Sequence, residues 1–200
     1  MSDLPSPSLM PPRSPELMSR ADSALLVVDV QDKLLPSIPS QARLVWNIRR
    51  LIDGARLLGV PVLATEQYPR GLGPTAPELA RRLGTIPEKL TFSCAGCAAL
   101  VSELRNLQRP KVLVVGIEAH VCVQQTVLDL LADGYRIYVG ADAIGSRFPL
   151  DRKIALRRME VTGATLTTVE SALFEWCSAA GSPEFKQISA LVRETRPGPG

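Results

Sequence analysis

The sequence predicts an α/β fold, in which a doubly wound parallel sheet of about six strands carries helices on both faces. Two observations predict it. Short apolar segments rich in β-branched residues alternate with segments of helical spacing over residues 22–176, and glycines follow several of the helical segments. Strands that are joined through helices form right-handed crossovers, so the sheet is expected to be parallel.

The first half of the pattern begins with a buried strand at Ala24–Val30. Residues 43–58 carry apolar side chains three and four positions apart, which predicts an amphipathic helix that Gly59 ends. The remaining elements expected in this half follow in chain order: a strand at 60–65, a Gly- and Pro-containing loop at 71–77, a short helix near 78–83, an extended segment at 87–92 and a helix at 95–107.

The second half repeats the alternation. The β-branched run Val112–Val115 predicts a strand, and helical spacing from about 120 to 131 predicts a helix that Gly134 ends. The later expected elements are a strand at 135–139, a helix at 150–161, a strand at 164–168 after Gly163, and helices at 169–176 and 183–194.

The ends of the chain differ in composition from this pattern. Residues 1–20 contain five prolines among Ser and Met, which is typical of a disordered lead-in. Residues 21–180 are expected to form one folded domain, and residues 181–200 a C-terminal helix followed by a frayed tail.

Composition excludes several function classes. The net charge is only +3 and aromatic residues make up 4%, too few for base-stacking platforms, so no nucleic-acid partner is expected. No apolar run approaches the roughly 18–20 residues that cross a bilayer, and the N-terminus lacks the apolar segment of an export signal. Four cysteines in a chain of 200 residues do not resemble a disulfide framework, so a cytoplasmic location is expected.

His120 is the only histidine, which rules out a metal site built from several His ligands within one chain. We therefore expect neither a metal nor a cofactor. A Cys-His pair or a Ser-His-Asp triad would have to use His120 itself, and its side chain lies only two positions from Cys122, poorly placed to face the thiol.

Three polar residues stand where parallel sheets bind ligands, at the carboxyl ends of strands. Asp29 interrupts the end of the first strand, Lys89 lies in the extended segment, and Cys122 opens a helix after a buried strand. Helix amides and the helix dipole favour a thiolate at Cys122. Taken singly, Asp29 is better explained as a helix cap or turn carboxylate and Lys89 as a surface lysine, while Cys122 fits a core thiol equally well. Together they would form a nucleophilic set.

Here the chain resembles a known family. The segments Val27-Val-Asp29-Val-Gln31, Lys89 with Phe92-Ser93, and Gly116-Ile-Glu-Ala-His-Val-Cys122 are similar to the three signatures of the isochorismatase-like cysteine hydrolases. The segment 62–75 further resembles the isochorismatase-domain-containing branch. The resemblance implies a six-stranded Rossmann-like fold, a catalytic Asp29–Lys89–Cys122 triad, and a homo-oligomer. It also implies a non-proline cis peptide at Ile117–Glu118 that turns the Glu118 amide, with the Cys122 amide, toward an oxyanion.

The chain departs from one part of that family. Its nicotinamidases carry an Asp-x-His and a further His that bind a metal, whereas this chain has Thr65-Glu-Gln-Tyr68 there and no second histidine. Isochorismate hydrolysis attacks a vinyl ether and need not use a thiol. We therefore expect metal-independent hydrolysis of a C–N bond in a small amide, or of a related acyl substrate, through a Cys122 thioester.

Two alternatives stay open. The protein could be a catalytically silent scaffold or interaction protein that retains the fold. The Cys94-Ala-Gly-Cys97 pair could mark a thiol–disulfide protein, although no Trp or Pro flanks it as in thioredoxin-type motifs.

Placement in the fold also predicts a substrate pocket and subunit contacts. The small-molecule substrate is expected to meet residues at strand ends and in the following loops: Gln31, Tyr68, Arg70, Phe92, Ile144 and Phe148. Apolar positions for a contact between subunits are expected in residues 150–161 and at Phe174 and Trp176.

Overall fold

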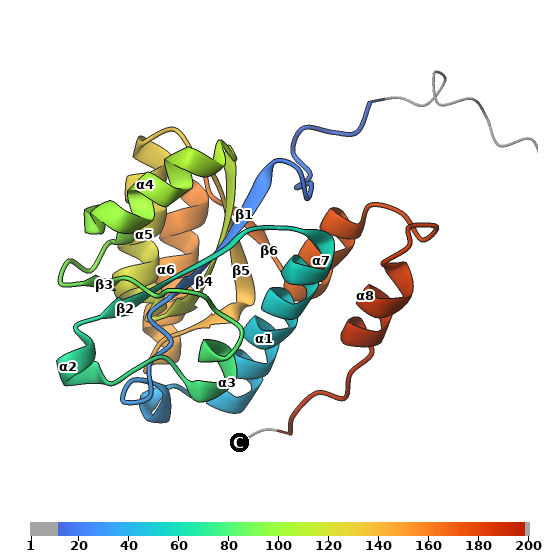
Figure 1. The fold of residues 1–200 in the computed structure, drawn as a ribbon. Coiled ribbons are helices and arrows are strands. Elements are labelled where there is room, and N and C mark those ends of the chain that lie inside the picture. Colours follow the sequence, from blue (N-terminus) through green and yellow to red (C-terminus); the bar gives the residue numbers. More distant parts are fainter. Residues whose placement is uncertain (1–11, 199–200) are drawn as a thin grey trace, which may run out of the picture.

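The computed structural model describes residues 12–198 and contains a six-stranded, fully parallel sheet in the order β3-β2-β1-β4-β5-β6 (Figure 1). This confirms the predicted fold class. The strands are β1 (Ser23–Val28), β2 (Val62–Gln67), β3 (Glu88–Lys89), β4 (Lys111–Ile117), β5 (Arg136–Gly145) and β6 (Thr165–Thr167).

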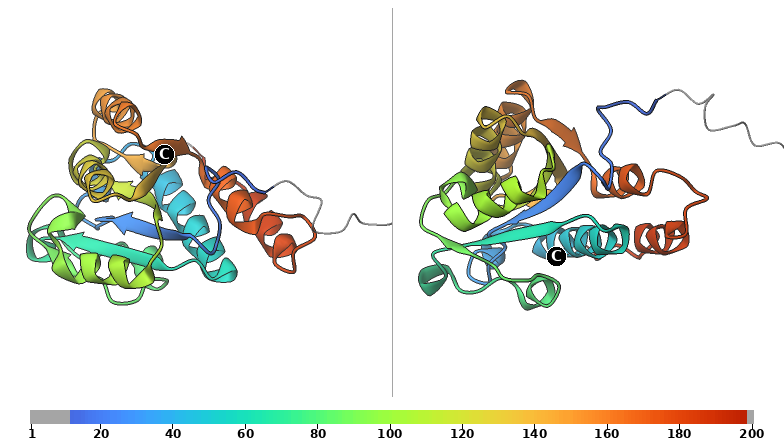
Figure 2. Two further views of the ribbon diagram at one scale, coloured as in Figure 1. Left: turned by 90° about the horizontal axis from the view of Figure 1, so that it is seen from above. Right: turned by 45° about the horizontal axis from the view of Figure 1, so that its top comes forward.

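Helices cover both faces of the sheet, and a separate apolar core lies under each layer (Figure 1). One layer contains α1 (Gln41–Leu58) and α7 (Val169–Cys177). The helix α8 (Phe185–Val192) packs on both of them at the periphery of the domain (Figure 2). The other layer contains α4 (Ala98–Leu107), α5 (Gln124–Ala132) and α6 (Pro149–Val161).

Short elements lie in the connections that follow β1, β2, β3 and β4. They are η2 (Leu35–Ser37), α2 (Pro69–Leu72), α3 (Pro77–Ala80), η3 (Cys94–Gly96) and the π-helical turn η4 (Ala119–Val123). Within residues 12–198, no helix has both the length and the apolar content that a membrane span requires.

Several element boundaries differ from the predicted ones. The strand expected at 135–139 continues to Gly145, because a register shift between Val114 and Gly116 of β4 lets β5 resume pairing beyond the irregularity. The helix expected near 78–83 is only the single turn α3, and the loop expected around 71 contains the turn α2. The helix expected from 120 begins with the wider turn η4.

Residues 12–20 differ from the disordered lead-in that their composition predicts. The Met18 side chain is fully buried, and its backbone N–H donates to the Glu175 carboxylate at 2.8 Å. The Arg13 guanidinium donates to the carbonyl oxygens of Met18 and Glu175. Specific contacts with α7 therefore order this proline-rich segment, whereas residues 1–11 lie outside the described part of the chain.

Trp176 also differs from its predicted position at a subunit contact. Its side chain is only 1% exposed and belongs to the core beneath α1 and α7. Phe174, two residues earlier on the same helix, is partly exposed. A helix turns by about 100° per residue, so positions two apart face different directions.

The carboxyl edge of the sheet is shaped by two unusual backbone conformations. Gly116 in β4 has a φ of +125°, and a Cβ there would lie 2.1 Å from the carbonyl oxygen of Val28 in β1. Only glycine fits so close to the neighbouring strand. Asp29, directly after β1, has a φ of 51°, a left-handed conformation that Asp tolerates better than most residues. The chain thereby turns at Asp29 beside the end of β4.

Candidate active site

A buried ion pair joins the ends of two strands at this edge. The Lys89 ammonium donates to Oδ2 of Asp29 at 2.6 Å, and the side chains of both residues are at most 1% exposed. Asp29 follows β1 and Lys89 ends β3, while β2 lies between these strands. Parallel strands bring their carboxyl ends to one edge, which is why residues sixty positions apart meet here.

The intervening strand β2 supplies two further polar side chains to the pair. The Thr65 hydroxyl donates to Oδ1 of Asp29 at 2.8 Å. The side-chain oxygen of Gln67 accepts from the Lys89 ammonium at 2.8 Å. The backbone oxygens of Thr91 and Phe92 also accept from Lys89, at 3.2 and 2.9 Å. Side chains of β2 and backbone oxygens after β3 therefore fix the positions of Lys89 and Asp29.

Sequence reasoning missed the roles of Thr65 and Gln67. The available signal was their spacing in β2: Thr65 and Gln67 lie two positions apart, so their side chains point to the same face of the sheet. Both are buried, and Thr65 is in register with Val28, the residue before Asp29. Two buried polar residues at the end of a strand need hydrogen-bond partners. Asp29, at the end of the adjacent strand β1, is the nearest candidate.

Cys122 completes the cluster from the other neighbouring strand. It lies in η4, after β4, and its thiol lies close enough to the Asp29 carboxylate to experience that negative charge. The residue is 5% exposed. The three residues that the sequence singled out, Asp29, Lys89 and Cys122, are therefore brought together, and Asp29 contacts both of the others.

The electrostatics of the cluster oppose one expectation from the sequence. Burial raises the pKa of Asp29, although the Lys89 charge and hydrogen bonds from Lys89, Cys122 and Thr65 oppose this shift. Burial, followed by the adjacent Asp29 charge, raises the pKa of the Cys122 thiol despite the Lys89 ammonium. The pKa of Cys122 therefore shifts in the direction opposite to the one that the helix terminus and Lys89 favour, because the thiol loses more hydration than these groups restore.

The segment between β4 and Cys122 contains a cis peptide bond between Ile117 and Glu118. The Glu118 carboxylate accepts from the backbone N–H of Arg147 at 3.2 Å and from its Nε at 3.1 Å. The loop after β5 is therefore attached to the start of η4.

A cavity of about 380 Å³ lies beside Lys89, between the end of β2 and the end of β3. Two of the six predicted pocket residues, Tyr68 and Arg70, line it together with Pro69, Glu88, Lys89 and Leu90. Phe92 and Phe148 are exposed at the same edge of the sheet, but neither lines this cavity.

Gln31 and Ile144 do not fit the predicted pocket. Gln31 is completely buried: its amide nitrogen donates to the carbonyl oxygens of Gln67 and Gly73, and its oxygen accepts from the Gln67 backbone. Its hydrogen-bonding groups hold β2 in place and are not free for a substrate. Ile144 is 3% exposed and lines a different cavity, beside α1.

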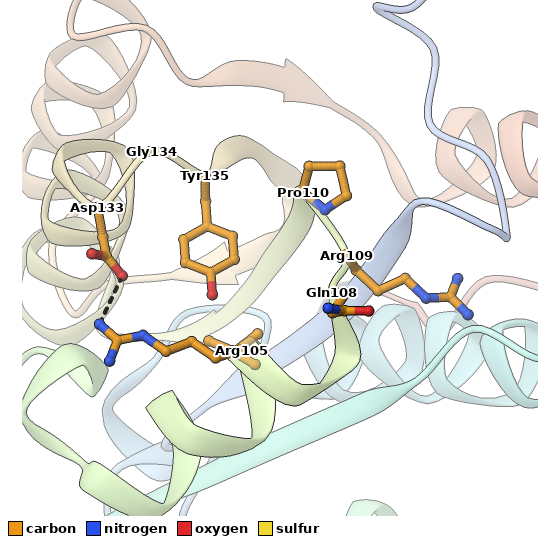
Figure 3. A pocket seen from close by; sticks show the side chains of 8 residues that line it. Arg105, Gln108, Arg109, Pro110, Asp133, Gly134 and Tyr135 are labelled. Carbon is orange, nitrogen blue, oxygen red and sulfur yellow. Dashed lines mark ion pairs between the residues drawn. The ribbon is translucent and has the colours of Figure 1, made fainter.

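Another hollow, of about 360 Å³, lies at the amino ends of the strands (Figure 3). Pro110 and Tyr135 immediately precede β4 and β5, and the ion pair between Arg105 and Asp133 spans its rim at 3.6 Å. Because Cys122 follows the carboxyl end of β4, this hollow lies at the other end of the strands from the Asp29–Lys89–Cys122 cluster.

Cys94, Cys97 and His120 each contact a polar group, and the partner of Cys94, Thr65, also donates to Asp29. All four cysteines are free and buried. The sulfur of Cys94 lies 3.3 Å from the Thr65 hydroxyl, and burial raises the pKa of this thiol to about 11. Cys97 contacts the Glu88 carbonyl oxygen. His120 Nδ1 lies 3.0 Å from the Ser146 hydroxyl. In residues 12–198, no group of three or more His, Cys, Asp or Glu side chains is arranged to hold a metal ion.

The parallel sheet and its layers of helices define this chain as an α/β protein with an isochorismatase-like hydrolase fold. Residues 23–171 match the family described as the isochorismatase domain, and the chain belongs to that family.

Relatives with the same domain cover most of the chain. Isochorismatase domain-containing protein 2A of Mus musculus is 42% identical over 179 residues, which are 89% of this chain and 86% of the mouse protein. The secreted isochorismatase effector Isc1 of Phytophthora sojae is 40% identical over 178 residues, 86% of this chain and 85% of the effector. Among solved structures, the MAR1 ribonuclease of Caenorhabditis elegans superposes with a TM-score of 0.85 at 38% identity, covering 92% of this chain and 96% of the other.

Proposed function

We propose that this protein is a cysteine-dependent hydrolase that cleaves a small amide or a related acyl compound through a thioester on Cys122. One observation carries the proposal: the Cys122 thiol lies beside the buried Asp29 carboxylate, whose Oδ2 atom accepts from the Lys89 ammonium. A thiol that is protonated at rest needs a base when it attacks, and Asp29 is within reach.

The first half-reaction forms the thioester. Asp29 accepts the thiol proton while the sulfur of Cys122 bonds to the carbonyl carbon of the substrate, whose π electrons move to oxygen. The resulting oxyanion is held by the backbone N–H groups of Glu118 and Cys122. This assignment is supported by their place at the start of a helical segment, where amides lack partners within the helix. When the C–N bond breaks, Asp29 returns the proton to the leaving amine.

The second half-reaction releases the acid. Asp29 accepts a proton from water, and the hydroxide oxygen bonds to the thioester carbon. The C–S bond then breaks, and the Cys122 sulfur recovers a proton from Asp29. Throughout both steps the Lys89 ammonium stays paired with Oδ2 of Asp29, so that it orients the carboxylate and stabilises its charged form.

The cavity beside Lys89 supports a small substrate. A volume of about 380 Å³ lies within the range of ordinary small-molecule sites. The Tyr68 ring provides a flat apolar wall, and the Arg70 guanidinium is able to bind a carbonyl or carboxylate oxygen. We propose no metal and no cofactor, since the single histidine leaves the thiol and the carboxylate as the reactive groups.

We further propose a homo-oligomer that uses α6. Leu150, Ile154 and Val161 recur at four- and seven-residue intervals along that helix and are all exposed. This spacing places them on one side of the helix, and an exposed apolar stripe favours a protein contact. The four free cysteines support the cytoplasm as the location, because reducing conditions keep such thiols unpaired.

The test is a panel of small primary amides, with release of ammonia as the readout. Wild type and Cys177→Ala should both release ammonia from at least one amide, and Cys122→Ala should not. Cys177 is a matched control, because it is also a buried free thiol but contacts Ser182 instead of Asp29. Asp29→Asn should turn over the same amide about 10²–10⁴-fold more slowly.

Three outcomes would overturn the proposal. Equal release by Cys122→Ala would show that the thiol is not the nucleophile. A complete lack of turnover over the panel would favour a silent scaffold. Cleavage of a single-stranded RNA included in the panel, lost in Cys122→Ala and without amide hydrolysis, would favour the activity named for the C. elegans relative.

A further inference from the structure

A second cavity, of about 290 Å³, lies beside the amino end of α1 and is unusually rich in arginine. Arg43 reaches it from the first turn of α1, Arg152 from α6, and Arg196 from the segment after α8. These three guanidinium groups come from distant parts of the chain. Among residues 12–198, Asp142 is the one carboxylate in the lining, so the positive charges of these residues exceed the negative by two.

The arginines are not neutralised by carboxylates. Within residues 12–198, none of Arg43, Arg152 and Arg196 forms an ion pair within 4.0 Å. Arg152 donates through Nε to the Ile144 carbonyl oxygen at 3.1 Å and through Nη2 to the Ala141 carbonyl oxygen, and these neutral acceptors leave its charge uncompensated. Nε of Arg43 is buried and has no hydrogen-bond partner among those residues. A buried donor without a partner is costly, and three converging cations repel one another.

Other lining groups are compatible with an anion. The amino end of α1 borders the cavity at Ser40, whose side chain does not cap the helix, and the first turn contains no acidic residue. The positive end of the helix dipole is therefore not compensated within the helix. Asp142 is engaged elsewhere through Oδ1, which accepts from the Val169 backbone N–H at 2.9 Å.

We propose that this cavity binds the phosphate group of a small molecule. Planar guanidinium groups match the oxygens of phosphate, and a dianion would balance the two excess positive charges. The cavity exceeds the size of inorganic phosphate alone, which leaves room for an attached organic group. Leu44 in its wall belongs to the core beneath α1 and Ile144 to the core that contains Cys122, but none of Asp29, Lys89 and Cys122 lines the cavity. The site is thus separate from the Asp29–Lys89–Cys122 cluster.

The experiment is isothermal titration of the full chain with inorganic phosphate at constant ionic strength, since screening weakens exposed charge interactions. Wild type should bind one phosphate per chain, and acetate should bind more weakly. Arg43→Gln should weaken phosphate binding about 10- to 100-fold, the factor expected when a charged hydrogen bond is removed.

Three further variants make the result specific. Arg81→Gln removes the same charge from an exposed position at the end of α3 and should bind phosphate like wild type. Arg196→Gln, in an exposed segment near the chain end, should weaken binding without threatening the fold. Cys122→Ala should bind phosphate normally, which separates this site from the hydrolase proposal.

The proposal would be overturned by any of three results. These are a lack of saturable binding at about 10 mM phosphate, equal affinity of Arg43→Gln and Arg81→Gln, and acetate binding as tight as phosphate.

Discussion

Asp22 provides a prediction about stability whose size follows from its contacts. Its carboxylate accepts from the Lys111 ammonium at 2.8 Å, from the Ser19 backbone N–H and from the Ser23 hydroxyl. Lys111 begins β4, is only 5% exposed in its side chain, and also donates to the Leu17 carbonyl oxygen. The Asp22–Lys111 ion pair therefore holds the segment before β1 against the start of β4.

The magnitude comes from the pKa of Asp22. These hydrogen bonds outweigh the opposing effect of burial and lower the pKa from 3.8 to about 2. A difference of 1.8 units (3.8 − 2) corresponds to roughly 2.4 kcal/mol in favour of the folded state. Because the side chain is 33% exposed, solvent screening reduces this to about 1–2 kcal/mol.

The pH dependence has a definite sign. A carboxyl group whose pKa is lower in the folded state stabilises the protein above its unfolded pKa, and this contribution disappears as the pH falls through the folded pKa. For Asp22 the full contribution is present above pH 3.8 and is lost toward about pH 2. About half of it should remain at pH 3.

The assay is urea unfolding of wild type and Asp22→Asn at pH 7, 5 and 3. Asp22→Asn should unfold with a free energy about 1–2 kcal/mol lower at pH 7 and with about half that deficit at pH 3. Asp133→Asn is the matched control: its ion pair with Arg105 is longer, 3.6 Å, and more exposed, so we expect about 0–1 kcal/mol. A deficit that is as large at pH 3 as at pH 7 would refute the electrostatic reasoning.

Four other results are expected. Thr65→Val should slow amide turnover and raise the pKa of Asp29 in the pH–rate profile, since the Thr65 hydroxyl donates to that carboxylate; an unchanged profile would contradict this. Because the pKa of Cys122 is raised, its alkylation by iodoacetamide should accelerate about tenfold per pH unit from 7 to 9, and a plateau near neutral pH, followed by mass spectrometry, would show a thiolate instead. Turnover should survive exhaustive chelation, whereas stoichiometric zinc lost together with activity would argue against the thiol mechanism. Light scattering should give a mass above the 21.6 kDa of one chain, and Leu150→Glu should shift it toward one chain; a wild-type monomer would sink the oligomer proposal.

Local patterns in the sequence were sufficient for the fold class. Apolar runs and helical spacing predicted five strands of a parallel sheet, and an extended segment was expected where β3 lies. A strand or helix must bury one apolar face, and the order of its own residues determines that face. The same reasoning selected Asp29, Lys89 and Cys122, since each polar residue follows or ends a strand whose carboxyl end lies at one edge. All three residues are at most 5% exposed.

Only the tertiary structure decided which groups these residues meet. Gln31 looked available for a substrate, but its amide is used by Gln67 and Gly73. Thr65 and Gln67 were not selected, although they contact Asp29 and Lys89 directly. The pKa of Cys122 shifts opposite to expectation. Hydrogen-bond partners and desolvation depend on atoms that distant segments bring together, whereas a residue's neighbours in the sequence determine only its local conformation.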